Sequence, residues 1–187
     1  MAEKFTVYEN ETWTVGKLIK LISQFDSVLD IGCGNGRIIK KVDAPIRWGV
    51  DICQAAITQA KQKNPDSVKF IVDKLCNLSL HFGPKSIDCV IGIDIIEHFH
   101  YIEAVELLHT CDVIARKCLI FFVPVGNHPQ TEDDRGYSND HYQTHRSTWY
   151  PEMMKMFGYN VNLYPNWHKN IKPPKEKGAM WCLKKQE

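Results

Sequence analysis

Apolar runs alternate along this chain with segments in which apolar and polar residues mix. A continuous apolar run bounded by turn residues predicts a buried strand, while apolar residues that recur every three or four positions predict an amphipathic helix. Strands are predicted at residues 28–31, 46–51, 68–72, 87–93 and 118–123, and helices at 14–25, 38–42, 54–63 and 101–116. Strands that alternate with helices predict parallel pairing through crossover connections, and therefore an α/β fold.

The pattern changes after the fifth predicted strand. Residues 125–146 have no periodicity, and a loop of that length in a compact domain is usually functional or disordered. We expect Ser147 to cap a helix that has Pro151 in its first turn and ends at Gly158. The apolar residues expected to pack inward from this helix are Met153, Met154, Met156 and Phe157.

Two segments with alternating apolar residues, 159–164 and 179–184, predict a final pair of strands, joined by the lysine- and proline-rich segment 166–177. The chain thus predicts a doubly wound α/β fold with a seven-stranded, mostly parallel sheet and helices on both faces. Its length of 187 residues fits one domain, which we place at 1–187.

Composition narrows the class of protein. A hydrophobic content of 44% and a charged content of 24% are ordinary for a soluble globular protein. The net charge of +1 argues against binding nucleic acid through bulk electrostatics alone. The seven cysteines are scattered and form no C-x-x-C pair, which favours reduced thiols over disulfides or a zinc site. With no apolar leader or membrane span in the sequence, we expect a cytoplasmic protein.

The most informative stretch follows the first predicted strand. Gly32-Cys33-Gly34-Asn35-Gly36 is a glycine-rich loop, and glycines let a chain turn sharply while a ligand approaches the backbone. The helix predicted after it would direct N–H groups at that ligand. The second predicted strand ends at Asp51, which a doubly wound sheet places beside this loop, where it can accept from ribose hydroxyls. The spacing matches neither a dinucleotide fingerprint nor a Walker loop.

The run Leu-Asp-Ile-Gly-Cys-Gly-Asn-Gly, followed by Gly-Val-Asp, resembles the class I S-adenosylmethionine-dependent methyltransferases. The resemblance implies one antiparallel strand near the C-terminus and S-adenosylmethionine as cofactor, with S-adenosylhomocysteine as product. It also implies that Asp51 takes the ribose. The other cofactor-binding residues implied are Asp30, Gly32, Cys33, Gly34 and Gly36 at the loop, Ile52, Asp73 and Lys74 around the adenine, and Asp94 at the fourth strand.

Candidates for chemistry on the acceptor begin at the tip of that fourth strand. Asp94, Glu97 and His98 lie where this family places residues that touch both cofactor and acceptor. Since Asp94 and Glu97 are three positions apart, they share a face if the chain turns helical there. The alternative is that Glu97 and His98 only shape the loop and take no part in the chemistry. His145, at the far end of the long loop, can return over the same site and completes the set of catalytic candidates.

The pattern Asp94-x-x-Glu97-His98 together with His145-x-x-x-Trp149 also resembles the RNA 3′-terminal 2′-O-methyltransferases, in which two acids and two histidines hold a divalent metal. Such a ligand set suits Mn, Fe, Co or Zn better than Ca. The chain departs from that family by having Asp94 in place of Glu and by lacking its Pro-Asn pair after the fifth strand. The leading interpretation therefore assigns no metal and keeps these four residues as candidate ligands.

Three functions remain open at this point. The first is methyl transfer from S-adenosylmethionine to an oxygen, nitrogen or carbon atom of a small-molecule acceptor. The second is metal-assisted 2′-O-methylation of an RNA ribose. The third is a non-catalytic, cofactor-binding subunit that supports a partner. The sequence favours the first, with no membrane partner expected, and it leaves the acceptor and the oligomeric state open.

Overall fold

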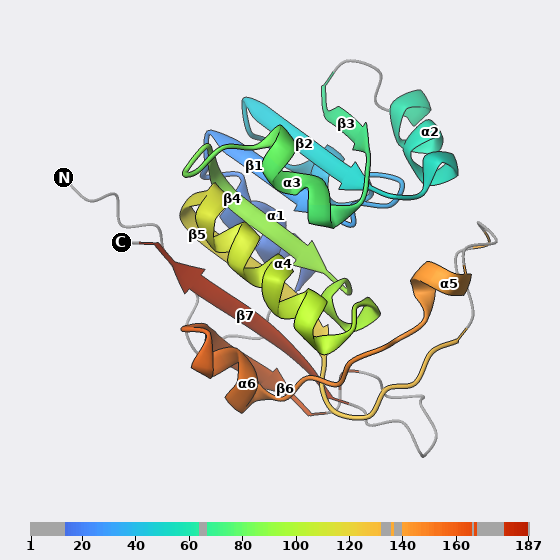
Figure 1. Ribbon diagram of the computed structural model, residues 1–187. Helices are drawn as coiled ribbons and strands as arrows, with labels where there is room; N and C mark the ends of the chain where they lie inside the picture. The colour runs from blue at the N-terminus through green and yellow to red at the C-terminus, as the bar shows by residue number, and fades with distance from the viewer. Residues whose placement is uncertain are drawn as a thin grey trace.

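The fold is a doubly wound α/β sheet, as predicted (Figure 1). The computed structural model describes residues 14–63, 67–131, 136, 140–165, 167 and 178–186. The seven strands run in the order β3-β2-β1-β4-β5-β7-β6. The pairs among β1 to β5 are all parallel, while β7 runs antiparallel to both β5 and β6. From β1 the chain adds β2 and β3 on one side and then β4 and β5 on the other. This reversal of strand order puts the topological switch point at the carboxyl end of β1, where ligands bind in such sheets.

Most elements lie where the apolar pattern places them. The strands are β1 (Ser27–Ile31), β2 (Ile46–Asp51), β3 (Lys69–Val72), β4 (Ile87–Ile93), β5 (Ala115–Pro124), β6 (Asn160–Tyr164) and β7 (Ala179–Lys185). The α-helices are α1 (Val15–Ile22), α2 (Gln54–Lys63), α3 (Leu78–His81), α4 (Tyr101–Ile114), α5 (Asp140–Gln143) and α6 (Pro151–Met156). Short 3₁₀ turns are η1 (Ile39–Lys41), η2 (Leu75–Asn77) and η3 (Ile96–His98).

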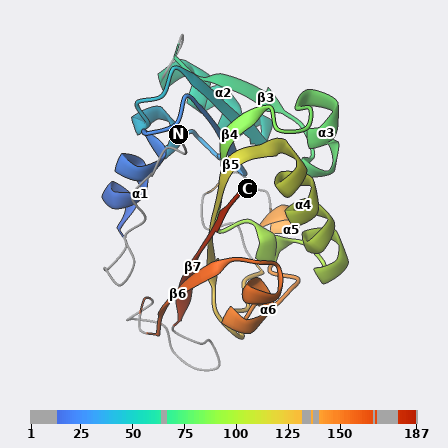
Figure 2. The ribbon, with the colours of Figure 1, turned by 90° about the vertical axis from the view of Figure 1, so that its left-hand side faces the viewer.

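Two apolar cores cover the two faces of the sheet. One core packs residues of α1 and α2 against the sheet, and the other packs residues of α3, α4 and α6. Figure 2 shows α1 on one side of the sheet and α4 and α6 on the other. With both faces covered, β1 is buried throughout and β4 nearly so, which explains their continuous apolar character. No helix among the described residues is both long and apolar enough to cross a membrane.

The first crossover differs from the prediction. Instead of an α-helix over residues 38–42, the chain forms turns and the three-residue η1. The 3₁₀ turn ends at Lys41, and Pro45 directly precedes β2, which begins at Ile46. The strand β1 is therefore joined to β2 by a short connection rather than by a full helix.

The C-terminal region holds further corrections. Ser147 does not cap α6; the helix begins at Pro151 with Tyr150 as its N-cap, since proline fits the first helical position. Met154 is buried as expected, but Met156 is 86% exposed. The long loop contains α5, and β5 begins earlier than predicted. The lysine- and proline-rich segment lies, apart from Trp167, outside the described residues.

The buried carboxylate of Asp88 links the amino ends of three central strands, at the end of the sheet opposite the switch point. The Asp88 side chain is fully buried, and it accepts hydrogen bonds from Arg116 Nε (2.6 Å) and from the backbone amide of Asp26 (3.2 Å). Lys117 Nζ lies 3.3 Å from the same carboxylate, and the Asp88 amide donates to Ser27 Oγ at 2.8 Å. This cluster joins the beginnings of β1, β4 and β5.

We expect Asp88→Ala to lower the free energy of unfolding by about 2–3 kcal/mol, because the Asp26 amide loses its acceptor and Arg116 and Lys117 lose the buried carboxylate that pairs with them. Asp88→Asn should cost less, since its amide oxygen still accepts. Denaturant unfolding measures both, with the exposed Asp43→Ala as the matched control. A change below about 0.5 kcal/mol for Asp88→Ala would contradict this role.

Candidate active site

The glycine loop has the backbone that its sequence predicts. Gly32, Gly34 and Gly36 all have positive φ angles, of 68°, 53° and 74°, a region that other L-residues adopt only with strain. At Gly32 an added Cβ would lie 2.5 Å from Ile95 Cδ1. The loop therefore requires glycine for both its conformation and its close packing against the residue that follows β4.

The loop amides are held by the protein itself. The amides of Gly32 and Cys33 both donate to Val50 O, at 2.8 and 3.1 Å, and the Gly34 amide donates to Asp51 Oδ2 at 2.7 Å. These three N–H groups donate to acceptors at the end of β2. The loop thus offers a smooth backbone surface without Cβ atoms rather than a cradle of free donors.

Asp51 stands at the tip of β2, beside the loop. Its Oδ2 accepts from Gly34, and its Oδ1 accepts from the Cys53 amide at 2.8 Å. Each carboxylate oxygen can accept more than one hydrogen bond, so both oxygens retain capacity for a ligand. The carboxylate is therefore fixed in place with acceptor capacity left for ribose hydroxyls.

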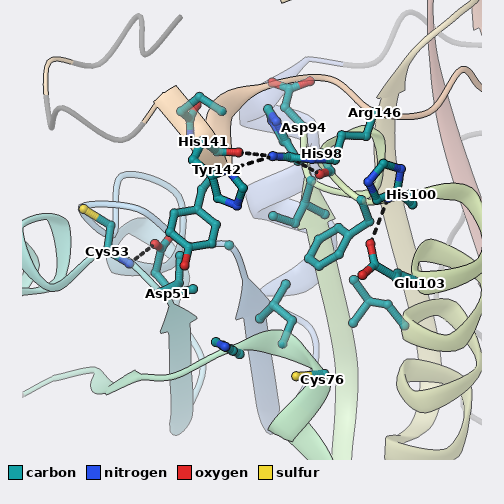
Figure 3. A pocket seen from close by; sticks show the side chains of 18 of the residues that line it. Asp51, Cys53, Cys76, Asp94, His98, His100, Glu103, His141, Tyr142 and Arg146 are labelled. Atoms are coloured by element: carbon teal, nitrogen blue, oxygen red, sulfur yellow. Dashed lines mark hydrogen bonds between the residues drawn. The ribbon is translucent and has the colours of Figure 1, made fainter. Parts of the chain in front are cut away.

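A cavity of about 660 Å³ opens at this edge of the sheet (Figure 3). This volume lies within the range of small-molecule and cofactor sites. The predicted cofactor residues that line it are Gly32, Gly34, Asp51, Ile52, Lys74 and Asp94. Those that do not line it are Asp30, Cys33, Gly36 and Asp73. The carboxyl ends of β1, β2 and β4 and the residues just after β3 thus meet at one cavity.

Asp73 is committed to its own turn. Its Oδ1 accepts from the Lys74 amide and from Asn77 Nδ2, at 2.7 and 2.8 Å, and its Oδ2 lies 2.7 Å from His81 Nε2. The hydrogen bonds from His81 and Asn77 lower the pKa of this carboxyl below its ordinary value. In this arrangement Asp73 orders the chain after β3, and its neighbours Lys74 and Leu75 face the cavity instead.

Two further predicted cofactor residues, Asp30 and Cys33, are buried beside the glycine loop and do not line the cavity. Asp30 is buried within β1, and Cys33 is buried against Gly49, where an added Cβ would lie 2.7 Å from Cys33 Sγ. Burial raises the pKa of the Cys33 thiol well above its ordinary value, and the charges of Asp30 and Asp51 raise it further. Cys33 is thus a neutral packing residue at neutral pH.

Asp94 enters the cavity from a strained position. Its φ is 50°, and its amide donates to Phe122 O at 3.0 Å, which holds the turn at the end of β4. A non-glycine residue in this region costs about 1 kcal/mol or more and persists where the surrounding structure enforces it. The strain turns the chain sharply out of β4, and Asp94 lines the cavity.

The other three catalytic candidates come together. A carboxylate oxygen of Glu97 and imidazole nitrogens of His98 and His145 all lie within 4.8 Å of one another. The Glu97 side chain is buried, and the rings of His98 and His145 meet edge to face with centroids 4.8 Å apart. Asp94 does not belong to this cluster, which we call the Glu-His-His cluster. Three of the four residues proposed from the sequence as ligands therefore converge.

A hydrogen bond to a backbone carbonyl fixes the tautomer of the neutral His145 ring. Its Nδ1 lies 2.6 Å from the backbone carbonyl of His128, which can only accept, so Nδ1 carries the proton. The lone pair of the neutral ring is then on Nε2. A backbone carbonyl that orients a ligating histidine in this way is typical of metal sites.

The segment after His145 docks firmly on η3. The amides of Arg146 and Ser147 both donate to Glu97 O, at 2.7 and 3.1 Å, and Ser147 Oγ donates to Ile96 O at 3.3 Å. Trp149 is fully buried, and its Nε1 donates to Ser147 Oγ at 2.9 Å. The return of the long loop over the site, expected from the sequence, is thus built by backbone pairing and one buried anchor.

A second, smaller cavity of about 150 Å³ lies on the other side of the Glu-His-His cluster. Glu97, His145 and His128 line it, whereas His98 lines the large cavity. The cluster therefore stands in the wall between the two cavities. His128 belongs to the long loop 125–146, and no spacing in the sequence links it to Glu97.

The short helix α5 faces the large cavity beyond the carboxyl ends of the central strands (Figure 1). His141, Tyr142 and Gln143 line that cavity, and Figure 3 shows Tyr142 extending toward Asp51. A four-residue helix leaves no periodic signal, so the sequence does not predict that these residues lie at the cofactor cavity.

The comparisons agree with this geometry. Residues 28–117 match the model of a methyltransferase domain family. No curated protein matches the chain. Solved structures share its fold, among them the methyltransferase domain of bacterial CtHen1 (TM-score 0.61, 17% identity, covering 92% of this chain and 97% of that one). A S-adenosylmethionine-dependent methyltransferase from Archaeoglobus fulgidus is similar (TM-score 0.66, 17% identity, 92% and 91% covered).

A third structure, magnesium protoporphyrin IX methyltransferase from Synechocystis PCC 6803, contains bound S-adenosylhomocysteine (TM-score 0.61, 16% identity, 92% and 81% covered). At such identities the likeness establishes the fold. The family match makes residues 28–117 a methyltransferase domain, and the glycine loop and Asp51 fit S-adenosylmethionine as its methyl donor.

Proposed function

We propose that this enzyme methylates a hydroxyl oxygen of a small-molecule acceptor that carries two adjacent hydroxyls, with the help of a divalent metal ion. The observation that carries the proposal is the convergence of Glu97, His98 and His145 beside the cofactor cavity. The identification as a methyltransferase stands without this proposal, which concerns the acceptor and the metal.

The cofactor fits the large cavity through residues already in position. We assign the ribose hydroxyls to Asp51, whose two oxygens are held by the Gly34 and Cys53 amides. The backbone of Gly32 and Gly34 lies against the cofactor because neither residue has a side chain to keep it away. Ile52 and Lys74 line the remaining part of the cavity, where we place the adenine.

The donor set of the Glu-His-His cluster fits a transition metal. Two imidazoles and one carboxylate with open positions suit Fe, Mn, Co or Zn better than Ca or Mg. With Nδ1 bonded to the carbonyl of His128, His145 would hold such an ion through Nε2, and the buried Glu97 would supply negative charge. A divalent ion bound there supplies a Lewis acid that lowers the pKa of a coordinated hydroxyl. Three protein ligands leave positions open for an acceptor.

The transfer itself places limited demands on the chain. The acceptor oxygen attacks the methyl carbon, the bond from that carbon to sulfur breaks, S-adenosylhomocysteine leaves with the electron pair, and the hydroxyl proton passes to water. Since the sulfonium is already a good leaving group, the main task is to align the two reactants. Asp94 lines the large cavity, and we assign to it the role of orienting the methyl donor.

The size of the second cavity favours a small acceptor. At about 150 Å³ it has room for a single ring, and Glu97 and His145 are at its wall. The chain also carries a net charge of only +1, so a general attraction for a polyanion is weak. These features support a small, uncharged ring as the acceptor, and catechol and the ribose of a nucleoside are rings of this kind that carry the adjacent hydroxyls proposed above.

The terminal ribose of an RNA is the second candidate. It presents the same pair of hydroxyls, and the arrangement of Glu97, His98 and His145 supports the resemblance to RNA 3′-terminal 2′-O-methyltransferases. The CtHen1 domain is among the structures with a similar fold. The two candidates differ in the size of the acceptor and share the chemistry of the site.

An assay of methyl transfer from labelled S-adenosylmethionine tests the proposal. Catechol and adenosine represent small diols, and a short RNA is offered with a free or a periodate-oxidised 3′ end. We expect turnover of a small diol with Mn²⁺ or Co²⁺ and at least about a hundredfold less with chelator. Turnover of the intact RNA alone would favour the second candidate, and turnover that ignores the chelator would contradict the metal.

A further inference from the structure

Arg146 lies in the wall between the two cavities. It lines the large cavity together with His141 and Tyr142, and it lines the small cavity together with Glu97 and His145. Among the residues described as lining the two cavities, Arg146 is common to both. Its position therefore connects the cofactor side of the site with the acceptor side.

The guanidinium of Arg146 is used as a bridge between backbone carbonyls. Its Nη1 donates to His98 O at 2.9 Å and to Thr144 O at 3.2 Å, and its Nη2 donates to His141 O. Both hydrogens of Nη1 and one of Nη2 are thus committed to carbonyl oxygens. This pattern differs from an anion clamp, in which a guanidinium presents paired N–H groups to a ligand.

The bridged segments lie far apart in the sequence. His98 belongs to η3 and to the Glu-His-His cluster, and it is 48 residues away from Arg146. His141 and Thr144 belong to residues 140–144, which we call the cover segment because it includes α5 and faces the large cavity. Figure 3 shows Arg146 between His141 and His98 at one end of that cavity. A single side chain therefore joins the two segments, in addition to the backbone pairing of residues 146 and 147 with Glu97.

We propose that Arg146 is a positioning residue that couples the cover segment to the Glu-His-His cluster, so that S-adenosylhomocysteine and a metal ion bind cooperatively. The metal half of this inference rests on the proposed function. The physical reason is linkage. A cofactor that contacts the cover segment stabilises the bridged arrangement, and a metal ion that fixes His98 stabilises the same arrangement. Each ligand then tightens the binding of the other by the same factor.

Titration calorimetry with S-adenosylhomocysteine tests the positioning role. In the presence of chelator, Arg146→Gln should raise the Kd about tenfold, because the charged bonds that hold the cover segment are lost. Arg146→Lys should recover part of this loss, since an ammonium still donates to one segment at a time. Arg37→Gln and Arg37→Lys are the matched controls, because Arg37 is exposed and lines neither cavity.

The coupling is measured by repeating the titration with Mn²⁺. We expect Mn²⁺ to lower the Kd for S-adenosylhomocysteine about fivefold in the wild type and in the Arg37 variants, and to have no such effect in Arg146→Gln. Hydrogen exchange gives an independent readout. The amides of residues 140–144 should exchange faster in Arg146→Gln, while those of the buried strand β4 stay unchanged.

The possible failures can be told apart. A wild-type Kd in Arg146→Gln overturns the positioning role while the proposed function stands. If Mn²⁺ titrated alone binds to the wild type but leaves its affinity for S-adenosylhomocysteine unchanged, the coupling is overturned and the metal site stands. If Mn²⁺ does not bind at all, both the metal site and the coupling fall, and the chelator titrations still decide whether Arg146 positions the cover segment.

Discussion

Replacing Glu97 by glutamine is expected to lower kcat about a thousandfold, or ~4 kcal/mol in transition-state stabilisation. Glutamine keeps the size of the side chain but loses the negative charge that would hold a divalent metal ion beside the two neutral imidazoles. Since Glu97 is buried within 4.8 Å of ligand atoms of His98 and His145, no solvent-exposed group can replace it without rearrangement. Steady-state kinetics with a productive acceptor and added Mn²⁺ measure the effect.

The control for this variant is Glu152→Gln. Glu152 is an exposed residue of α6 and lines neither cavity, so its kcat should stay within about twofold of the wild type. The affinity of Glu97→Gln for S-adenosylhomocysteine, measured with chelator, should change little, because Glu97 does not line the large cavity. A Glu97→Gln enzyme that retains more than a tenth of the wild-type kcat would contradict the role of this carboxylate.

The second large effect is expected at Asp51. Asp51→Ala should weaken the binding of S-adenosylhomocysteine about a hundredfold, as the two hydrogen bonds assigned to the ribose and the support of the Gly34 and Cys53 amides are lost together. Calorimetry on the folded variant measures the change. Asp43→Ala, an exposed substitution away from the cavity, should bind as the wild type does. An affinity within about threefold of the wild type for Asp51→Ala would contradict the assigned ribose site.

The local pattern was enough to predict the fold and the cofactor loop. β4 and α2 match their predicted bounds, because a buried parallel strand leaves a continuous apolar run and a ten-residue helix leaves apolar residues at helical spacing. The three glycines of the loop were recognisable since only glycine adopts their φ angles without strain. The first crossover was predicted as a helix and is a 3₁₀ turn, because a five-residue apolar pattern is too short to distinguish the two.

The site was predictable where it follows from strand ends, and less so where it follows from long-range contacts. Asp51 and Asp94 lie at the tips of β2 and β4, and the topology alone brings such residues to one edge. The hydrogen bonds of Asp73 within its own turn, by contrast, depend on Asn77 and His81 and have no sequence signature. The same holds for His128, whose carbonyl orients His145 across the loop.

One measurement tests the central claim most directly: a thermal-shift titration of metal-depleted protein with S-adenosylhomocysteine, with Mn²⁺, and with both. Because a ligand that binds only the native state raises Tm as its concentration increases, each site reports separately. The account predicts a shift with S-adenosylhomocysteine, a further shift with Mn²⁺, and loss of the Mn²⁺ shift alone in Glu97→Ala. A Mn²⁺ shift that persists in Glu97→Ala, or the absence of any Mn²⁺ shift in the wild type, would contradict it.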